Sequence, residues 1–369
     1  MNITKRQSFF LLLISTLFML SCKKDGERKE EISIPILWQG IPSIEKTDNG
    51  RIFVAWYSGG SGEPAPENTC FFSYSDDNGA TFTDRQIIAA PRTTHRAYDP
   101  CLWIDPDKQF WYIFNRSSTQ TGEHAVYARI CENPNAENLV WSNEFLLDFN
   151  VPYAFRSTKP AVLSTGEWVF PVTHASEKIF AWFFFGQETQ GVAVTTNKGK
   201  MWSLYGNVAT PSWGLENMIV ELNDGRLWML MRSGVDYLWE SFSSDRGKTW
   251  SEGKASSISN PVSRFFICRL QSGNLLLVNH YKFIGRSHLT AKISIDDGAS
   301  WNEGLLLDER EWVSYPDGVQ DKDGTIWIVY DRDRQGAGEI LLAKFREEDV
   351  IAGKNVSDKV SLKQIVNRK

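Results

Sequence analysis

The clearest pattern in the sequence is a tight turn followed by an apolar, β-prone run, repeated six times. The runs are NGRIFVAW, DKQFWYIF, TGEWVFPV, DGRLWMLM, SGNLLLVN and DGTIWIVY. Asp-Gly and Asn-Gly between such runs favour β-hairpins, because both positions tolerate positive φ. The turn positions are Gly50, Lys108, Gly166, Gly225, Gly273 and Gly324, separated by 58, 58, 59, 48 and 51 residues. Each unit is long enough for about four strands, the content of one blade of a β-propeller.

A second series of motifs has the same period. The stretches SDDNGATF, TNKGKMW, SSDRGKTW and SIDDGASW approximate S-x-D-x-G-x-T-W and close on Phe82, Trp202, Trp250 and Trp301, while Trp141 fills the gap as a degenerate member. The motif resembles the Asp box, or BNR repeat, of sialidases and related propellers, in which it is a structural turn. The spacing and terminal Glu of a calcium-binding EF-hand are absent. The two series together predict an all-β, six-bladed propeller with four-stranded antiparallel blades.

The propeller is predicted as one domain over residues 32–350. GEILLAKF (338–345) is the last clear strand, and residues 351–369 are expected to form a C-terminal tail. We expect the run SIPILW (33–38) to close the sixth blade by pairing with C-terminal strands.

The first residues have the layout of a signal peptide. Lys5 and Arg6 precede an apolar run that ends just before Cys22 and is too short to span a membrane. A cysteine at this place resembles the lipobox of bacterial lipoproteins. Residues 1–22 are therefore interpreted as a signal peptide with lipidation at Cys22, and residues 23–31 as a tether; plain secretion is the alternative. The expected location is lipid-anchored on a bacterial membrane, with the outer membrane as first choice, facing the periplasm or the cell surface.

Composition narrows the function classes. A formal charge of −5 argues against nucleic-acid binding, because no basic stripe is available to displace counterions. Fifteen Trp residues suit an all-β or sugar-binding protein. Four further cysteines lack C-x-x-C spacing, so buried free thiols or one disulfide are favoured over a zinc site: Cys70, Cys101, Cys131 and Cys268. We expect no cofactor and no metal.

The ends of the hairpins predict where a site lies. Glu216 precedes Gly225 by nine residues and Arg232 follows it by seven, so a hairpin turning at Gly225 returns both to one rim. Offsets of the same size, to within one residue, give in the other units Gly40, Tyr57, Asp99, Asn115, Arg116, Arg156, Ser157, Thr173, His174, Arg264, His280, Tyr315, Asp331 and Arg332. Arginines at this rim favour an anionic ligand held by bidentate contacts. The alternative for any one of them is an ion pair with a neighbouring carboxylate, as for Arg332 beside Asp331 and Asp333.

Over nearly its whole mature length the chain resembles the exo-α-sialidase (neuraminidase) superfamily. That family binds the substrate carboxylate with three arginines and uses a tyrosine nucleophile, a glutamate that activates it and an aspartate as acid/base. The resemblance implies Glu216 as the activating glutamate, Tyr315 in SYPDG as the nucleophile, and Arg232 and Arg286 as two of the arginines. The loop GSGEPAPEN places Glu63 at the acid/base position, with Glu67 as the fallback.

The resemblance fails in the first unit. Sialidases begin with Arg-Ile-Pro, whereas this chain reads WQGIPSI, with Gly40 in place of the arginine. Asp331 matches an acidic residue that steers the missing arginine in the family. Arg264, Arg96 or Arg116 are the candidates to replace it. The predicted substrate-binding set is Arg232, Arg286, Arg264, Asp331, Asp99, Arg116 and His280.

The resemblance implies an exo-acting glycoside hydrolase that removes a terminal acidic sugar, sialic acid first, with retention through a tyrosyl intermediate. The alternatives are a propeller glycosidase or lyase for uronic-acid-containing polysaccharides, a non-catalytic glycan-binding propeller, and a scaffold for protein partners. The expected partner is a glycan that carries an acidic sugar, with no nucleic acid and with membrane contact only through the lipid anchor.

Overall fold

The computed structural model describes residues 35–118, 120–155, 158–179, 188–280 and 285–369. All of them belong to one compact unit, Ile34–Lys369. The predictions for the signal peptide, the lipidated Cys22 and the tether fall outside the described residues and stay predictions. Within the described residues, no helix has the length and apolar character needed to cross a lipid bilayer.

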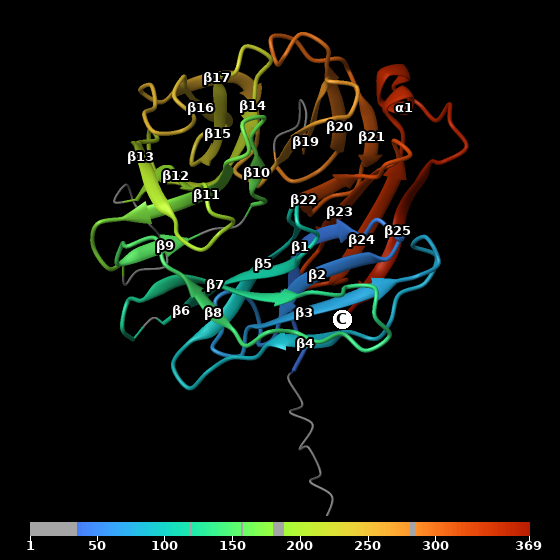
Figure 1. Cartoon of the computed structure of the whole chain (residues 1–369). Helices are drawn as coiled ribbons and strands as arrows, with labels where there is room; N and C mark the ends of the chain where they lie inside the picture. Colours follow the sequence, from blue (N-terminus) through green and yellow to red (C-terminus); the bar gives the residue numbers. More distant parts are fainter. Residues whose placement is uncertain (1–34, 119, 156–157, 180–187, 281–284) are drawn as a thin grey trace, which may run out of the picture. The chain divides into compact units, whose positions relative to one another are not determined.

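The described residues form an all-β fold of antiparallel sheets (Figure 1). The first sheet contains β1 (Gln39–Lys46), β2 (Ile52–Ser58), β3 (Thr69–Ser75) and β4 (Gln86–Ala89). Three further sheets also have four strands each. One contains β14 (Gly214–Glu221), β15 (Leu227–Ser233), β16 (Tyr237–Ser243) and β17 (Lys254–Ser259), and the next contains β18 (Phe266–Arg269), β19 (Leu275–His280), β20 (Leu289–Ser294) and β21 (Leu305–Asp308). The last contains β22 (Val313–Gln320), β23 (Ile326–Arg332), β24 (Glu339–Phe345) and β25 (Ser361–Arg368).

The second and third predicted units form one nine-stranded sheet. Its strands are β5 (Arg96–Ile104), β6 (Phe110–Ser117), β7 (His124–Cys131), β8 (Phe145–Leu147), β9 (Tyr153–Phe155), β10 (Ala161–Val162), β11 (Trp168–Ala175), β12 (Thr189–Thr195) and β13 (Ser203–Val208). Both β9 and β10 pair with β11, so they are two pieces of one split strand. A single parallel pair, His124 with Tyr153, joins β9 to β7 and merges the two units.

The six predicted apolar runs are confirmed as strands β2, β6, β11, β15, β19 and β23, the second strand of each unit. Every residue of β2, β15 and β23 except Arg332 is buried. Their runs are continuously apolar because neighbouring sheets cover both faces. In Figure 1, β1, β5, β14 and β22 lie toward the middle, whereas β4, β13, β17 and β25 lie toward the outside.

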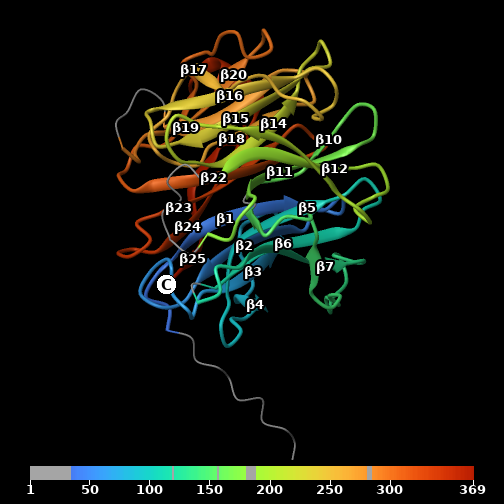
Figure 2. The same ribbon diagram turned by 90° about the vertical axis from the view of Figure 1, so that its left-hand side faces the viewer.

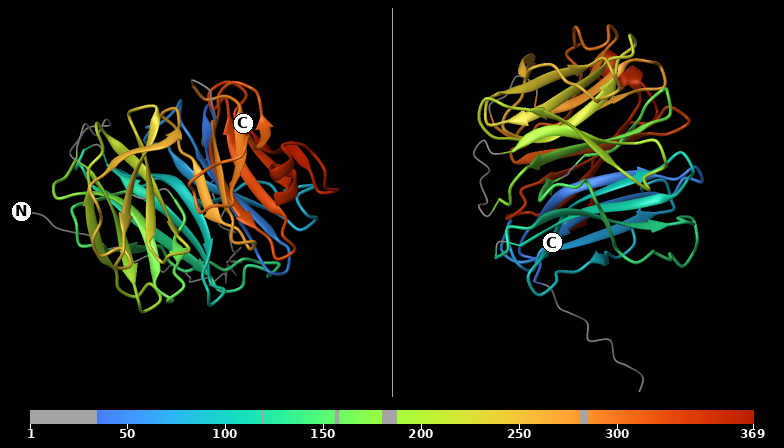
Figure 3. Two further views of the ribbon diagram at one scale, coloured as in Figure 1. Left: turned by 90° about the horizontal axis from the view of Figure 1, so that it is seen from above. Right: turned by 60° about the vertical axis from the view of Figure 1, so that its left-hand side comes forward.

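The last sheet packs against the first, so the succession of sheets closes on itself. Strand β1 contacts both β5 and β22, and β14 contacts β11 and β18. The red C-terminal strands therefore lie beside the blue N-terminal ones, as two further views show (Figure 3). Ile44 and Trp56 of the first sheet share one apolar cluster with Trp327 and Val329 of the last. Burial of these side chains is the main favourable term that holds the closure together.

The predicted pairing of the run 33–38 with C-terminal strands is wrong for residues 35–38, the part of the run that the structure describes. Ile36 forms only an isolated bridge to Gly60, while β25, from the predicted tail, pairs with β24 and completes the last sheet (Figure 2). Val366 is the only buried residue of β25. An edge strand is held by its main-chain hydrogen bonds and needs no apolar alternation, so residues 361–368 were not recognised as a strand from their pattern. The short helix α1 (Glu347–Ala352) connects β24 to β25.

The four S-x-D-x-G turns share one hydrogen-bond pattern. In the turn of residues 243–250, Gly247 N donates to Ser243 Oγ (2.9 Å), and both the backbone and the hydroxyl of Thr249 donate to Asp245 (2.8 and 2.7 Å). These hydrogen bonds lower the pKa of Asp245 to about 2. The equivalent residues Asp77 and Asp296 have the same contacts and pKa values of about 2. Cys70, Cys101, Cys131 and Cys268 form no disulfide with one another.

The turn aspartates predict a specific acid sensitivity. A carboxylate whose pKa is lower in the folded than in the unfolded protein stabilises the fold above its ordinary pKa, 3.8 for Asp, and this stabilisation is lost as pH falls to about 2. We expect Asp245→Asn to lower the urea midpoint at pH 6 and the deficit to shrink steadily from pH 4 to pH 2. Asp84→Asn, which removes an exposed carboxylate, is the control. A deficit that is independent of pH would contradict this account.

Candidate active site

The first strands of four units share the same irregularity. The pairing register breaks between Gly40 and Ser43, Tyr98 and Cys101, Leu215 and Met218, and Ser314 and Asp317. The first residue inside each break has positive φ: Ile41 58°, Asp99 47°, Glu216 57° and Tyr315 55°. For non-glycine residues such a backbone costs about 1–3 kcal/mol each, and bulges of this kind re-aim side chains beside functional sites. In three of the four strands the next residue is Pro, which cannot donate to a ladder.

The four bulge residues line one cavity of about 440 Å³. This volume is within the range of small-ligand sites. Glu63 and Arg232 add charge to its wall, while an apolar side is formed by Tyr98, Phe155, Trp213 and Leu215. In the first unit the bulge residue that lines the cavity is Ile41, whereas the predicted position was Gly40. Gly40 lies one residue earlier and pairs with Tyr57.

Tyr315 and Glu216 meet through Arg232 rather than directly. Arg232 Nη1 donates to the Tyr315 hydroxyl (2.6 Å) and to Glu216 Oε2 (2.7 Å). Arg264 Nη2 donates to the other Glu216 oxygen (3.4 Å). Burial acts to raise the pKa of Glu216, but Arg232 and Arg264 outweigh it and hold the pKa at about 2. Glu216 is therefore a fixed negative charge that keeps two guanidinium groups against the phenol.

Four arginines surround the ring of Tyr315. The guanidinium carbon lies 4.1 Å from the ring centroid for Arg334, 4.6 Å for Arg264, 5.3 Å for Arg286 and 5.6 Å for Arg232. Burial raises the pKa of the Tyr315 hydroxyl, and Arg232, Arg286 and Arg334 oppose that rise. Positive charge at this range favours a phenolate and also an anionic ligand beside it.

Two carboxyl groups face the cavity as possible proton donors. Glu63 accepts hydrogen bonds from the Tyr57 hydroxyl and from Arg334 Nη1 (3.0 Å), and its side chain is 34% exposed. Asp99 is buried 3.7 Å from Arg264 Nη2. Burial raises the pKa of Asp99 to about 7, although Arg264 acts to lower it. A carboxyl group with that pKa can donate a proton at neutral pH. The fallback residue Glu67 is exposed and does not line the cavity.

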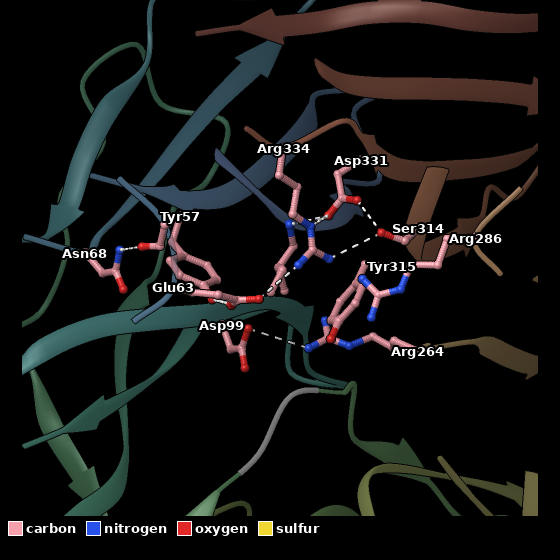
Figure 4. Close-up of polar contacts among 12 residues, drawn as sticks. Tyr57, Glu63, Asn68, Asp99, Arg264, Arg286, Ser314, Tyr315, Asp331 and Arg334 are labelled. Atoms are coloured by element: carbon pink, nitrogen blue, oxygen red, sulfur yellow. Dashed lines mark hydrogen bonds and ion pairs between the residues drawn. The ribbon is translucent and has the colours of Figure 1, made fainter. Parts of the chain in front are cut away.

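Asp331 and Arg334 form a second layer behind the cavity. Asp331 is fully buried and accepts hydrogen bonds from Ser314 Oγ (2.7 Å), Ile41 N (2.7 Å) and Arg334 Nε (2.9 Å). Figure 4 shows the Arg334 guanidinium between Asp331, Ser314 and Glu63, above the Tyr315 ring. The rim prediction omitted Arg334 because it lies in the turn after β23, beyond the strand end. The alternating charges of DRDR (331–334) were the available signal.

Of the remaining predicted residues, one lies near Tyr315 and the others lie outside the cavity or outside the described residues. Arg286 is near Tyr315, and its Nη2 donates to the Val262 carbonyl (3.1 Å). Arg116 lies outside the cavity, where it makes a bidentate ion pair with Glu144 (2.8 and 2.7 Å). His280 is also buried away from the cavity, and desolvation lowers its pKa to about 4. Arg332 forms an ion pair, as the alternative expected, but its partner is Glu339 (3.0 Å) and not the neighbouring Asp331 or Asp333. Arg156 and Ser157 fall outside the described residues.

Comparison with known proteins supports the fold. Residues 50–328 match the BNR repeat-like domain. The Hadza microbial sialidase Hz136 has a TM-score of 0.69 at 17% identity, over 85% of this chain and 66% of that one, so the chain spans slightly less than two thirds of it. The intramolecular trans-sialidase from Ruminococcus gnavus has a TM-score of 0.66 at 13% identity, over 85% of this chain and 95% of that one. An α-L-arabinanase from Penicillium chrysogenum has a TM-score of 0.60 at 14% identity, over 86% of this chain and 96% of that one. No curated protein matches the sequence significantly.

Asp99 predicts a pH dependence of stability with a definite sign. A carboxyl group whose pKa is raised from 3.8 to about 7 on folding holds its proton more tightly in the folded protein, so stability falls as pH rises across that interval. Asp99→Asn cannot ionise and escapes this loss. We therefore expect the urea midpoint of Asp99→Asn, relative to the parent protein, to improve between pH 4 and pH 8. Asp358→Asn, at an exposed position, is the control. A constant difference across this range would show that Asp99 is already ionised at pH 4.

Proposed function

The chain belongs to the family of proteins with a BNR repeat-like domain, and we propose that it is an exo-acting glycoside hydrolase that removes a terminal acidic sugar. The observation that carries the proposal is Tyr315, whose hydroxyl borders the cavity 2.6 Å from Arg232 while four guanidinium groups surround its ring. A neutral-sugar site has no need of so much positive charge. The fold alone does not decide this, because a sialidase and an arabinanase share it.

We propose a six-bladed propeller as the architecture that forms this cavity. The six hairpins, the splitting of the third inner strand into β9 and β10, and the single pair that joins β9 to β7 support six units rather than five. A hairpin of nearly constant length then carries one residue from each of several units to the same rim.

In the proposed reaction Tyr315 is the nucleophile. The Tyr315 hydroxyl first gives its proton to water in the cavity. Its phenolate oxygen then bonds to the anomeric carbon as the bond to the leaving oxygen breaks, and a carboxyl group gives that oxygen a proton. Water then attacks the same carbon, displaces the tyrosine and gives its proton to the carboxylate, with net retention. Glu63 and Asp99 are the two candidate acids. The raised pKa of Asp99 favours it, whereas Glu63 has the position implied by the family resemblance.

Glu216 is proposed as a positioning residue for the nucleophile. With a pKa of about 2 it is a weak proton acceptor. It holds Arg232 and Arg264 beside Tyr315, and their charges lower the energy of the phenolate. Sialic acid is the first choice of substrate, and a terminal uronic acid, cleaved by hydrolysis or by a lyase, is the second.

The proposal predicts loss of turnover in Tyr315→Phe. The protein from residue 23 onward is assayed on a fluorogenic sialoside, sialyllactose and uronate oligosaccharides, with arabinan as a neutral comparison. We expect turnover of an acidic glycoside and a fall in kcat of about 10³-fold or more in Tyr315→Phe, because no other group replaces the nucleophile. Tyr112→Phe is the matched control, since it removes a buried hydroxyl that donates to the Phe71 carbonyl outside the cavity. Binding of acidic sugars without any turnover would instead identify a glycan-binding propeller.

We also propose export and lipid anchoring at Cys22, which rest on the sequence of residues 1–22 alone. Cys22→Ala should move the full-length protein from the membrane fraction to the soluble fraction. Equal membrane recovery of both proteins would argue against the anchor.

A further inference from the structure

Gly40 and Arg334 occupy one space between the first and last sheets. A β-carbon on residue 40 would lie 2.8 Å from Arg334 Cδ and Nε and 2.9 Å from Cγ, closer than real β-carbon contacts allow. Gly40 is not among the residues with positive φ, so its backbone does not require glycine. Glycine is required at position 40 because the Arg334 side chain passes through the space that a β-carbon would fill. The residue that breaks the family pattern therefore makes room for an arginine from another part of the chain.

Arg334 is held in place from several sides. The Arg334 carbonyl accepts a hydrogen bond from Gln39 N (3.2 Å), which ties its turn to β1. Within the turn, Asp333 accepts hydrogen bonds from Gly336 N (3.0 Å) and Ala337 N (2.7 Å). The guanidinium donates through Nε to Asp331, the residue that steers the missing arginine in the family resemblance. The side chain is 12% exposed, so it is fixed rather than extended into solvent.

The same guanidinium contacts two residues of the cavity wall from behind, although Arg334 is not itself part of the lining. It stacks 4.1 Å from the Tyr315 centroid and contacts Glu63, and both of these residues line the cavity. Arginine has five N–H donors. Among the described residues, hydrogen bonds to Asp331, Glu63 and Ser314 account for three, which leaves one N–H on each of Nη1 and Nη2.

The three substitutes considered from the sequence are less suited to this role. Arg116 is paired with Glu144 outside the cavity. Arg96 donates to Ser117 Oγ (3.1 Å) and Asn68 Oδ1 (3.0 Å) and lies over the Tyr98 ring. Arg264 lies between Glu216 and Asp99.

We propose that Arg334 supplies the carboxylate-binding guanidinium that position 40 lacks, and that it makes the site selective for acidic over neutral sugars. This inference rests on the proposed function for the class of ligand, but it concerns binding and not turnover. Arg334 then completes an anion site with Arg232 and Arg286, whose guanidinium groups also lie beside the Tyr315 ring.

The test compares an acid with its neutral ester. Calorimetric Kd values are measured for N-acetylneuraminic acid and glucuronic acid and for their methyl esters, on the protein from residue 23 onward. Loss of a charge-assisted hydrogen bond should weaken binding of the acid by about 10- to 100-fold in Arg334→Ala and leave ester binding nearly unchanged. Arg332→Ala removes an equal charge two residues away, where the side chain pairs with Glu339, and should leave the acid-to-ester ratio unchanged.

A double-mutant cycle tests the shared space. Gly40→Ala should weaken acid binding nearly as much as Arg334→Ala, because its β-carbon displaces the arginine. In the Arg334→Ala background the same substitution should have almost no further effect. Thermal unfolding of all four proteins checks that each is folded. The proposal is overturned if the parent protein binds no acid in preference to its ester, if Arg334→Ala weakens acid and ester equally, or if the two substitutions are additive. Failure of turnover with intact acid selectivity would reject only the hydrolase.

Discussion

The site depends on buried guanidinium groups held by buried carboxylates. Each such charge loses its hydration on burial, a cost of several kcal/mol, and is tolerated only where partners restore it. Glu216 serves Arg232 and Arg264 at once, and Asp331 holds Arg334. Asp331 lies behind the cavity, whereas Glu216 is part of its wall beside Arg232. The guanidinium groups gather around the Tyr315 ring, and carboxyl groups line the rest of the charged wall. This arrangement follows from the fold, since its members come from strands and turns far apart in the sequence.

The strand bulges place the reactive groups in this field. Asp99, Glu216 and Tyr315 occupy the same position in three different hairpins, with the same left-handed backbone. A regular strand would direct the side chain at each position to one of its two faces, where the neighbouring sheets lie. The bulge turns it toward the cavity instead, at a cost in backbone strain that the buried sheets can bear. Repetition of one local distortion thus brings three chemically different side chains to one cavity.

The sequence predicted the site where the hairpins are regular and failed where they are not. The offsets measured from Glu216 and Arg232 led to Tyr315, and the three residues line one cavity because the hairpins have nearly constant length. The prediction of Gly40 missed Ile41 by one residue, although Ile41 is the residue that lies nine positions before Gly50. Arg334 lies beyond the strand end in a turn, and its proximity to Gly40 is a contact between opposite ends of the chain. The raised pKa of Asp99 depends on burial, which no spacing rule reports.

The fold shows the same division. Apolar runs covered on both faces predicted β2, β15 and β23, whereas β25 carries one buried side chain and is recognisable only from its main-chain pairing. The pair that joins β9 to β7 is likewise a backbone contact between two predicted units. What the sequence conveys well is the burial of side chains, and what it conveys poorly is the pairing of edges.

The central claim is that Tyr315, within its group of arginines, bonds covalently to an acidic sugar. Its most direct test is peptide mass spectrometry after incubation with a fluorinated acidic glycosyl fluoride, which forms a glycosyl-enzyme that water removes slowly. The account predicts one added sugar mass, located on Tyr315. A label on Glu63 or another side chain, or a protein that releases the sugar with inversion and is never labelled, would contradict it.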